Sequence, residues 1–350
     1  MLAAGSAPIV LVGDTFCSMT LPAANEQVRE RLQQLSVVKA IEEERIWSIH
    51  AVQRDPPVGL DRIDARNGLD QTFTFPDNAG AGVDVFVIDT GITTTHPEFT
   101  GRASIIDLTG EGNNDLNGHG THVAGTIAGS RFGIAKQASV TALKVFTATG
   151  SGPNGVILRA LQIVSETVRR TGRPSIVNMS LGGPRNPGRN AIQGAIESLT
   201  RMGVAVVVSA GNEARDACRT SPAFVPESIT VGAVDPRNDQ LARFSNVGSC
   251  VDLFSPGVRI DSADRIPTNG PRVLSGTSMS APHVAGVMAT YMSQGMNRAQ
   301  ALERLLQTST RDVVRGNLAG SPNILLFLHQ APPPPPGGGK YKCRRYRPRR

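Results

Sequence analysis

Three residues whose side chains complement one another chemically stand far apart in this 350-residue chain: Asp89, His119 and Ser278. A serine hydroxyl is a weak nucleophile until an imidazole takes its proton, and a carboxylate must fix the tautomer of that imidazole. The order acid, imidazole, hydroxyl along a chain is one of the known arrangements of such a triad. The three residues therefore suit nucleophilic acyl transfer, provided that the fold brings them together.

Each of the three residues lies where a strand is expected to end or a helix to begin. Asp89 follows the apolar segment 83–88, in the phrase DTGI. His119 begins the phrase HGTHVAG, and Ser278 lies in GTSMSAPH, at the start of a long apolar helical pattern. Pro282 suits the first turn of that helix, because first-turn amides have no acceptor within the helix.

The elements between residues 51 and 328 predict an α/β fold. Near-continuous apolar segments predict strands, and segments of helical spacing between them predict helices. The strands are expected at residues 83–88, 140–145, 176–179, 204–208 and 229–231, and the helices at 155–170 and 190–202. Strands of this kind, separated by helices, are typical of a mainly parallel sheet covered on both faces. Such sheets bind ligands beyond the carboxyl ends of their strands, where Asp89 stands.

Composition and charge exclude two classes of protein. The chain has no run of 18 or more apolar residues, which excludes a membrane-spanning helix. Its formal net charge of +7 equals the charge of segment 340–350, which holds two lysines, five arginines and no acid. The rest of the chain is balanced, with 29 basic and 29 acidic residues, so it lacks the basic face of a nucleic-acid-binding domain.

Four phrases together resemble those of the subtilisin-like serine proteases, most closely the proteinase K and aqualysin branch. They are DTGI, HGTHVAG, GTSMSAPH and SAGN (209–212), and the resemblance extends over residues 51–328. It implies a subtilisin-like three-layer α/β/α fold with a mainly parallel sheet. By the same resemblance Asp89 is the orienting acid, His119 the general base and Ser278 the nucleophile.

The resemblance also implies an oxyanion hole and a substrate cleft. The side-chain amide of Asn212 would join the Ser278 backbone amide in stabilising the developing negative charge. The segments expected to flank the substrate are Gly150, Ser151 and Gly152, then Ser180, Leu181 and Gly182, and then Ser209, Ala210 and Gly211. Glycines there allow the close approach of a peptide that binds as an added strand. The implied function is a serine endopeptidase of broad specificity, which acts on protein or peptide substrates without a catalytic cofactor.

Two alternatives remain beside this interpretation. One is an inactive protein of the same fold that binds a partner through its cleft or its tail, against which the full set of catalytic residue types argues. The other is a metal pair of His119 and His122, which are three residues apart. No third ligand lies near them in the sequence, and the resemblance makes His122 structural. His283 is expected to be a packed core histidine.

Residues 1–50 are expected to form a partial inhibitory propeptide of α+β type. Strands are predicted at 9–12 and 37–41, a second apolar stretch lies near 16–21, and a helix is predicted at 23–35. This segment resembles the later half of the family's propeptide, and the segment from Ala51 resembles the start of a mature enzyme. The resemblance implies a self-processed zymogen that is cut between His50 and Ala51. The alternative is that residues 1–50 are an additional structural flap.

The peptidase domain is expected to span residues 51–329, followed by a tail at 330–350. Five prolines and then three glycines open the tail, which is typical of an extended, disordered spacer. Its basic end suits contact with polyanionic surfaces. We expect a monomer. Residues 1–13 lack the charged start of a signal peptide.

The four cysteines, Cys17, Cys218, Cys250 and Cys343, can pair in three ways. The resemblance implies a disulfide between Cys218 and Cys250, and the alternative is two buried thiols. A disulfide favours an oxidising compartment, so we expect an extracellular, secreted protein, with a vacuolar or lysosome-like location as the alternative.

The resemblance also implies a structural calcium ion. Its ligands would be the carboxylate of Asp252 and the backbone carbonyls of Pro226 and Ser228, since calcium prefers oxygen ligands. The alternative is that Asp252 is an exposed or helix-capping aspartate.

Overall fold

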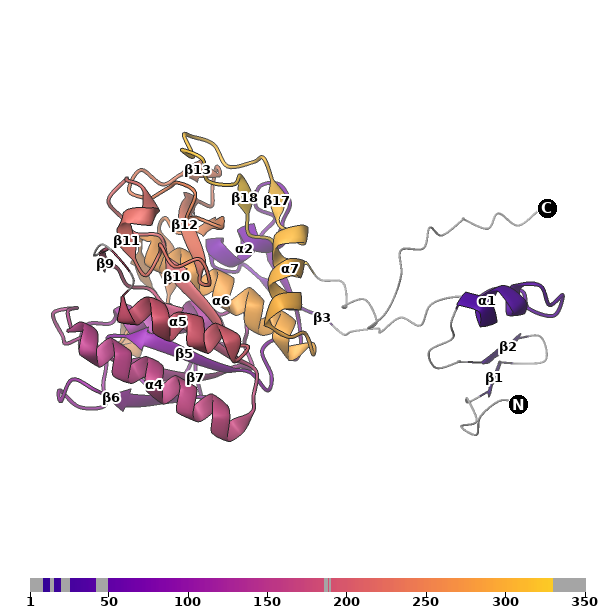
Figure 1. The fold of residues 1–350 in the computed structure, drawn as a ribbon, viewed down its shortest axis with the longest axis horizontal. Coiled ribbons are helices and arrows are strands. Elements are labelled where there is room, and N and C mark those ends of the chain that lie inside the picture. Colours follow the sequence, from indigo (N-terminus) through magenta and orange to yellow (C-terminus); the bar gives the residue numbers. More distant parts are fainter. Residues whose placement is uncertain are drawn as a thin grey trace. The chain divides into compact units, whose positions relative to one another are not determined.

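The computed structural model describes residues 9–12, 16–19, 26–41, 50–185, 188 and 190–329. These residues belong to two compact units, one within residues 9–41 and one spanning residues 50–329 (Figure 1). The second unit holds all three residues of the expected triad. The predicted tail, 330–350, lies outside the described residues.

The first unit contains one hairpin and one helix. β1 (Ile9–Val12) pairs antiparallel with β2 (Phe16–Met19), and α1 (Glu26–Gln33) follows. The strand predicted at 37–41 is wrong, because the N–H of Val38 donates to the carbonyl of Leu35 at 2.9 Å and closes a turn. Val37 is 79% exposed, so the side chain that suggested a strand faces solvent.

A mainly parallel sheet forms the centre of the second unit, which confirms the predicted fold class. All neighbouring strands from β6 to β18 run parallel, while β13 pairs antiparallel with β12 and β17 with β18. The strand order is β17 (Thr310–Arg311), β18 (Ile324–Leu325), β14 (Leu253–Pro256), β12 (Ile229–Asp235), β10 (Ala205–Ser209), β8 (Ser175–Met179), β5 (Asp84–Asp89), β7 (Ser139–Lys144) and β6 (Ala103–Asp107), and β13 is Gln240–Leu241.

Helices cover both faces of this sheet (Figure 1). On one face lie α3 (His119–Ala128) and α6 (Thr277–Ser293), and on the other α4 (Asn154–Thr171) and α5 (Ala191–Arg201). Strand β5 serves both cores: Val85 and Val87 pack with α3 and α6, whereas Phe86 and Ile88 pack with α4 and α5. Burial on both faces explains why the strands have continuous apolar sequences.

Shorter elements complete the unit. Antiparallel pairs are β3 (His50–Arg54) with β4 (Thr72–Pro76), β9 (Gly183–Pro184) with β11 (Thr220–Ser221), and β15 (Ile260–Ser262) with β16 (Arg272–Leu274). The remaining helices are α2 (Val58–Asp64), α7 (Arg298–Thr308) and two 3₁₀ turns, Ala217–Arg219 and Pro267–Asn269.

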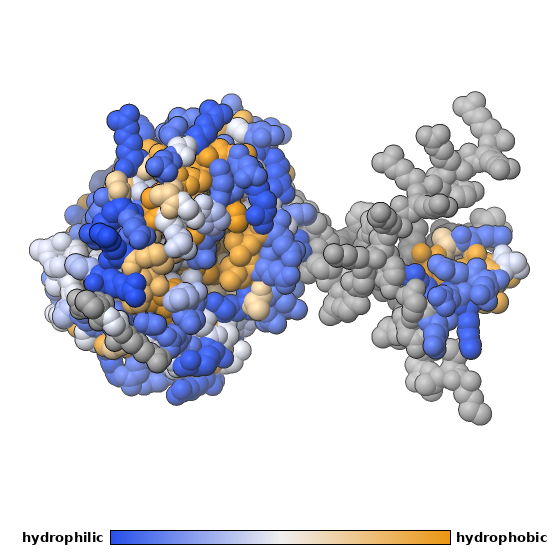
Figure 2. Space-filling view, turned by 45° about the horizontal axis from the view of Figure 1, so that its top comes forward, coloured by the Kyte–Doolittle hydropathy of each residue, from blue (hydrophilic) through white to orange (hydrophobic). Residues whose placement is uncertain are grey.

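The surface of this unit is mixed in polarity. Hydrophilic residues cover most of the face visible in Figure 2, and hydrophobic residues show between them. Among the described helices, none combines the length and the apolar character needed to cross a membrane.

A disulfide joins Cys218 to Cys250, as the sequence resemblance implied. The two cysteines are 32 positions apart, and their Cα atoms are separated by 5.3 Å. The bond ties the 3₁₀ turn Ala217–Arg219 to the loop before β14.

We expect removal of this disulfide to lower the free energy of unfolding. A cross-link between residues 32 positions apart restricts the unfolded chain, which amounts to about 3–4 kcal/mol on the chain-entropy model. The measurement is denaturant unfolding of the Cys218→Ala/Cys250→Ala variant beside the wild type. Under reducing conditions the two proteins should become equally stable, and equal stability under oxidising conditions would contradict the prediction.

Candidate active site

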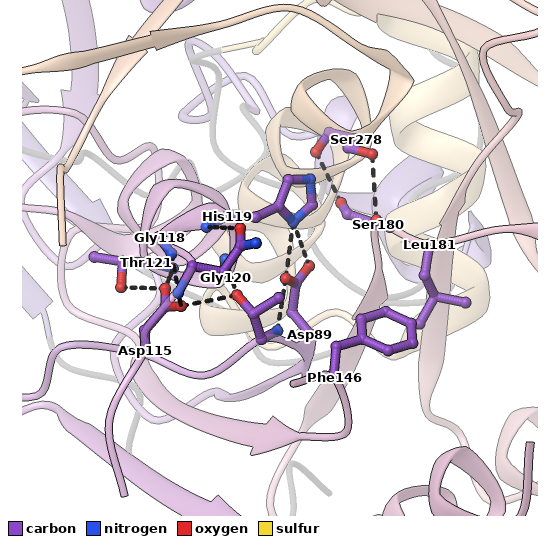
Figure 3. A network of polar contacts seen from close by, with 12 residues as sticks. Asp89, Asp115, Gly118, His119, Gly120, Thr121, Phe146, Ser180, Leu181 and Ser278 are labelled. Atoms are coloured by element: carbon purple, nitrogen blue, oxygen red, sulfur yellow. Dashed lines mark hydrogen bonds and ion pairs between the residues drawn. The ribbon is translucent and has the colours of Figure 1, made fainter. Parts of the chain in front are cut away.

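The fold brings the three residues of the expected triad to one edge of the sheet (Figure 3). Asp89 is the last residue of β5, and His119 is the first residue of α3. Ser278 is the second residue of α6. Figure 3 shows the imidazole of His119 between the side chains of Asp89 and Ser278.

Asp89 and His119 are in direct contact. Nδ1 of His119 lies 2.8 Å from Oδ1 and 2.9 Å from Oδ2 of Asp89. The Asp89 side chain is only 1% exposed, whereas that of His119 is 29% exposed. Burial by itself disfavours the charged imidazole, but the charge of Asp89 and its hydrogen bond outweigh that effect, so the pKa of His119 is raised above its usual value.

Ser278 is held between α6 and the end of β8. Its hydroxyl donates to the carbonyl of Ser180 at 3.2 Å, and the hydroxyl of Ser180 donates to the Ser278 carbonyl at 2.8 Å. The Ser278 hydroxyl is therefore directed to a backbone carbonyl instead of the imidazole. Catalytic hydrogen bonds of free enzymes are often formed only when substrate binds.

Asp115 is a buried acid that our sequence analysis overlooked. Its carboxylate accepts hydrogen bonds from the hydroxyl of Thr90 at 2.9 Å and from both the N–H and the hydroxyl of Thr121, at 2.8 and 2.7 Å. It also accepts from the N–H groups of Asn117 and Gly118. These bonds satisfy the amides at the start of α3 and so fix the helix that begins with His119. An aspartate just before a helix start is a sequence signal for this role.

Asn212 is held by the residue before Ser278. Its Oδ1 accepts hydrogen bonds from the N–H and the hydroxyl of Thr277, at 2.8 and 2.9 Å. Because the carbonyl end of this amide is occupied, its NH₂ group is left to donate to another acceptor. The side chain therefore suits an oxyanion, beside the N-terminal amides of α6.

The Subtilase family model matches residues 80–324 of this chain. The chain belongs to the subtilase family. It is 39% identical over 290 residues to Proteinase T of Parengyodontium album, covering 82% of this chain and 97% of that protein. It is 41% identical over 308 residues to the Extracellular serine proteinase of Thermus sp. (strain Rt41A), covering 86% of this chain and 73% of that protein.

A solved structure agrees with this assignment. The crystal structure of a cold adapted subtilisin-like serine proteinase matches with a TM-score of 0.73 and 40% sequence identity, covering 79% of this chain and 99% of that chain. This subtilase is therefore a subtilisin-like serine protease, a hydrolase that acts on protein substrates.

The segments expected to flank the substrate lie at the same edge of the sheet. Residues 180–182 follow β8, and the hydroxyl of Ser209, at the end of β10, donates to the carbonyl of Leu181 at 3.2 Å. Ser209, Ala210 and Gly211 are buried, whereas residues 150–152 are exposed. A Cβ on Gly152 would overlap the carbonyl oxygen of Val145, so only glycine fits there.

His122 and His283 are buried core residues in this subtilase. Nε2 of His122 lies 3.0 and 3.1 Å from the carbonyls of Ile260 and Arg272, and Nδ1 of His283 lies 2.8 Å from the carbonyl of Met279. Burial lowers the pKa of each to about 4. Among the described residues, no group of three or more His, Cys, Asp or Glu side chains is arranged to hold a metal ion.

Of the residues expected around calcium, Pro226 and Ser228 lie just before β12, and Asp252 lies just before the neighbouring parallel strand β14. Oδ2 of Asp252 accepts the N–H of Thr230 at 2.7 Å, and burial raises the pKa of Asp252 to about 6. The hydroxyl of Ser228 donates to the carbonyl of Val225 at 2.7 Å. A half-buried carboxylate with backbone carbonyls is an oxygen donor set of the kind that calcium prefers.

Proposed function

We propose that this subtilase is a serine endopeptidase that cuts internal peptide bonds of proteins through an acyl-enzyme on Ser278. In this proposal His119 is the general base, and Asp89 holds its ring. The observation that carries the proposal is the contact of His119 Nδ1 with both carboxylate oxygens of Asp89, at 2.8 and 2.9 Å. It supports the Nδ1–H tautomer, which leaves Nε2 free to accept the serine proton.

The proposed reaction has two halves. The hydroxyl oxygen of Ser278 attacks the carbonyl carbon of the scissile bond while its proton passes to Nε2 of His119. The amide of Asn212 and the N–H of Ser278 stabilise the resulting oxyanion. The intermediate then expels the leaving amine, which takes the proton from Nε2, and an ester on Ser278 remains. Water attacks this ester with the same base, which releases the new carboxyl terminus and restores the hydroxyl.

Substrate binding must redirect the serine hydroxyl from Ser180 toward His119. The 3.2 Å bond to the Ser180 carbonyl is long, so it opposes this rotation only weakly. A peptide would add as a strand between segments 150–152 and 180–182. Because these segments are rich in glycine and present backbone groups, we propose broad specificity.

The test is digestion of a denatured, alkylated protein by the purified chain, with products identified by mass spectrometry. Internal cleavage at many sites is the expected result. A folded chain that leaves the substrate intact would contradict the proposal and favour a binding protein of the same fold.

We further propose that the chain is a zymogen cut between His50 and Ala51. This bond begins β3, in which Ala51 pairs with Phe75 of β4. After cleavage β3 would remain held by Gln53, which donates to the carbonyl of Arg131 at 3.0 Å and accepts from Lys136 at 2.9 Å. The contacts support a mature enzyme that keeps its first strand, with residues 1–50 as its own inhibitory partner.

We expect terminal sequencing of the purified active protein to begin at Ala51. The Ser278→Ala variant should remain uncut, because self-processing needs the same nucleophile. A mature terminus elsewhere, or normal cutting of Ser278→Ala when it is expressed alone, would contradict self-processing at this bond.

Calcium is the proposed structural ion of this protein, held by Asp252, Pro226 and Ser228. Bound only by the folded state, it would stabilise the fold by about 2.7 kcal/mol at a concentration a hundredfold above Kd. We therefore expect a chelator to lower the unfolding temperature of the wild type, and added calcium to restore it.

Asp252→Asn is the matched variant for this prediction, since it keeps an acceptor for Thr230 but removes the charge. Its unfolding temperature should be low and insensitive to calcium. A response to calcium equal to that of the wild type would show that the ion binds elsewhere.

We also propose that the enzyme is a secreted monomer. The matched relative from Thermus is named as extracellular, and the disulfide suits an oxidising compartment. The basic tail would contact polyanionic surfaces, and deletion of residues 330–350 should then weaken retention on an anionic resin.

A further inference from the structure

Lys144, the last residue of β7, is a fully buried cation at the edge of the sheet where the triad lies. In the sheet register it stands opposite Asp89. Its Nζ donates to the carbonyls of Thr90 and Phe146, both at 3.0 Å, and lies 3.2 Å from Oε2 of Glu111. An ammonium group has three N–H donors, so all three are used.

Glu111 uses the same oxygen to hold the segment that follows β7. Its Oε2 accepts the N–H of Ala148 at 2.9 Å. On the other side, the side-chain amide of Asn117 donates to the carbonyl of Ala148, also at 2.9 Å. Both backbone polar groups of Ala148 are therefore fixed by side chains that lie more than 30 positions away in the sequence.

Polar contacts are the main restraint on the loop after Ala148. Residues 148–153 are all exposed, so this loop gains little from apolar packing. It closes on itself, because the N–H of Thr147 donates to the carbonyl of Ser151 at 3.0 Å and that of Gly150 to the carbonyl of Thr147 at 2.9 Å. The hydrogen bonds from Glu111 and Asn117 to Ala148, here called the clamp, fix the start of this loop and so restrain where residues 150–152 lie.

We propose that Glu111, anchored by Lys144, is a positioning residue that fixes the substrate-binding segment 150–152. The inference rests on the proposed function, in which this segment pairs with the peptide. Glu111 has no hydrogen bond to Asp89, His119 or Ser278 in the part of the chain that the structure describes. Its loss should therefore weaken binding of extended peptides and leave the chemistry at the scissile bond intact.

The test compares two substrates, a tetrapeptide p-nitroanilide that reaches segment 150–152 and a blocked single-residue ester that does not. For Glu111→Ala we expect KM for the tetrapeptide to rise about tenfold with little change in kcat, the effect of losing one charge-assisted hydrogen bond. The kinetic constants for the ester should stay those of the wild type. Glu111→Gln retains an acceptor for Ala148 and should largely restore KM.

Glu166→Ala is the control, because among the described residues its carboxylate accepts a single exposed hydrogen bond, from Gln162 on α4 at 2.8 Å. Glu111→Ala leaves the charge of Lys144 without its partner and could fail to fold for that reason. In that case the double variant Glu111→Ala/Lys144→Met, which also removes the buried charge, is used in the same assay instead of Glu111→Ala. Equal losses on both substrates, or no loss on either, would overturn the inference. A wild-type protein that is inactive on both substrates would overturn the proposed function and this inference with it. If the wild type is active, the comparison with Glu111→Ala tests only the role of Glu111.

Discussion

Ser278→Ala is expected to lower kcat for peptide hydrolysis about 10⁶-fold, the size of the loss when the serine of subtilisin, a relative, is removed. Without the hydroxyl no acyl-enzyme forms, and His119 has no proton to accept. The remaining rate would come from the oxyanion hole and substrate binding alone. The measurement is kcat with a chromogenic peptide, followed over long incubations at high enzyme concentration.

Ser280→Ala is the matched control for this prediction. It lies on the same helix and removes a buried hydroxyl that donates to the carbonyl of Ser255 at 3.1 Å. It should retain most of the wild-type activity. A Ser278→Ala protein that is as active as Ser280→Ala would exclude Ser278 as the nucleophile.

Asp89→Asn is expected to lower kcat about 10⁴-fold, as the same change does in other Ser-His-Asp enzymes. The amide keeps the size of the side chain, but its NH₂ group can donate to Nδ1 and so stabilise the wrong tautomer of His119. The reaction then lacks a base at Nε2. Asp84→Asn, at the other end of β5, is the control, because the half-buried Asp84 carboxylate forms an ion pair with Arg173 at 3.1 Å and has no hydrogen bond or ion pair with His119 among the described residues.

The pH dependence of kcat/KM tests the same pair of residues. Asp89 raises the pKa of His119 above 6.5, and the imidazole must be neutral to act as a base. Wild-type activity should therefore fall as the pH drops through this raised pKa. In Asp89→Asn the negative charge is absent, so the acid limb of the residual activity should move to lower pH. An unchanged limb would show that another group controls it.

Much of the fold could be predicted because buried strands and helices have recognisable patterns of apolar residues in the sequence. The strand predicted at 83–88 is observed as β5 (Asp84–Asp89), one residue later, since the extended backbone continues to Asp89 after the apolar run ends. The predicted helices at 155–170 and 190–202 are α4 and α5, each within one residue.

The elements that the sequence did not reveal are those without such a pattern. β6 (Ala103–Asp107) is an edge strand with half-exposed side chains, and β14 (Leu253–Pro256) is a four-residue strand that ends in proline. The apolar residues at 37–41 suggested a strand, yet a strand also needs a partner, which no local pattern reports.

Some residues of the site could likewise be predicted from local sequence patterns, and others could not. Asp89, His119 and Ser278 could be predicted to meet because each stands at the end of an element on one sheet edge. Asp115 has a local signal, as an acid before a helix start, but many acids share that signal without any role in a site. The clamp of Glu111 on Ala148 joins positions that are 37 residues apart through one hydrogen bond, so only the folded structure reveals it.

Covalent labelling shows whether Ser278 is an activated nucleophile, on which the proposed hydrolysis depends. The folded protein is treated with a serine-directed sulfonyl fluoride, and its intact mass is measured beside that of Ser278→Ala. We expect a single adduct that maps to Ser278 and is absent from the variant. A folded wild-type protein that gains no adduct, or gains the same adduct as Ser278→Ala, would contradict this expectation.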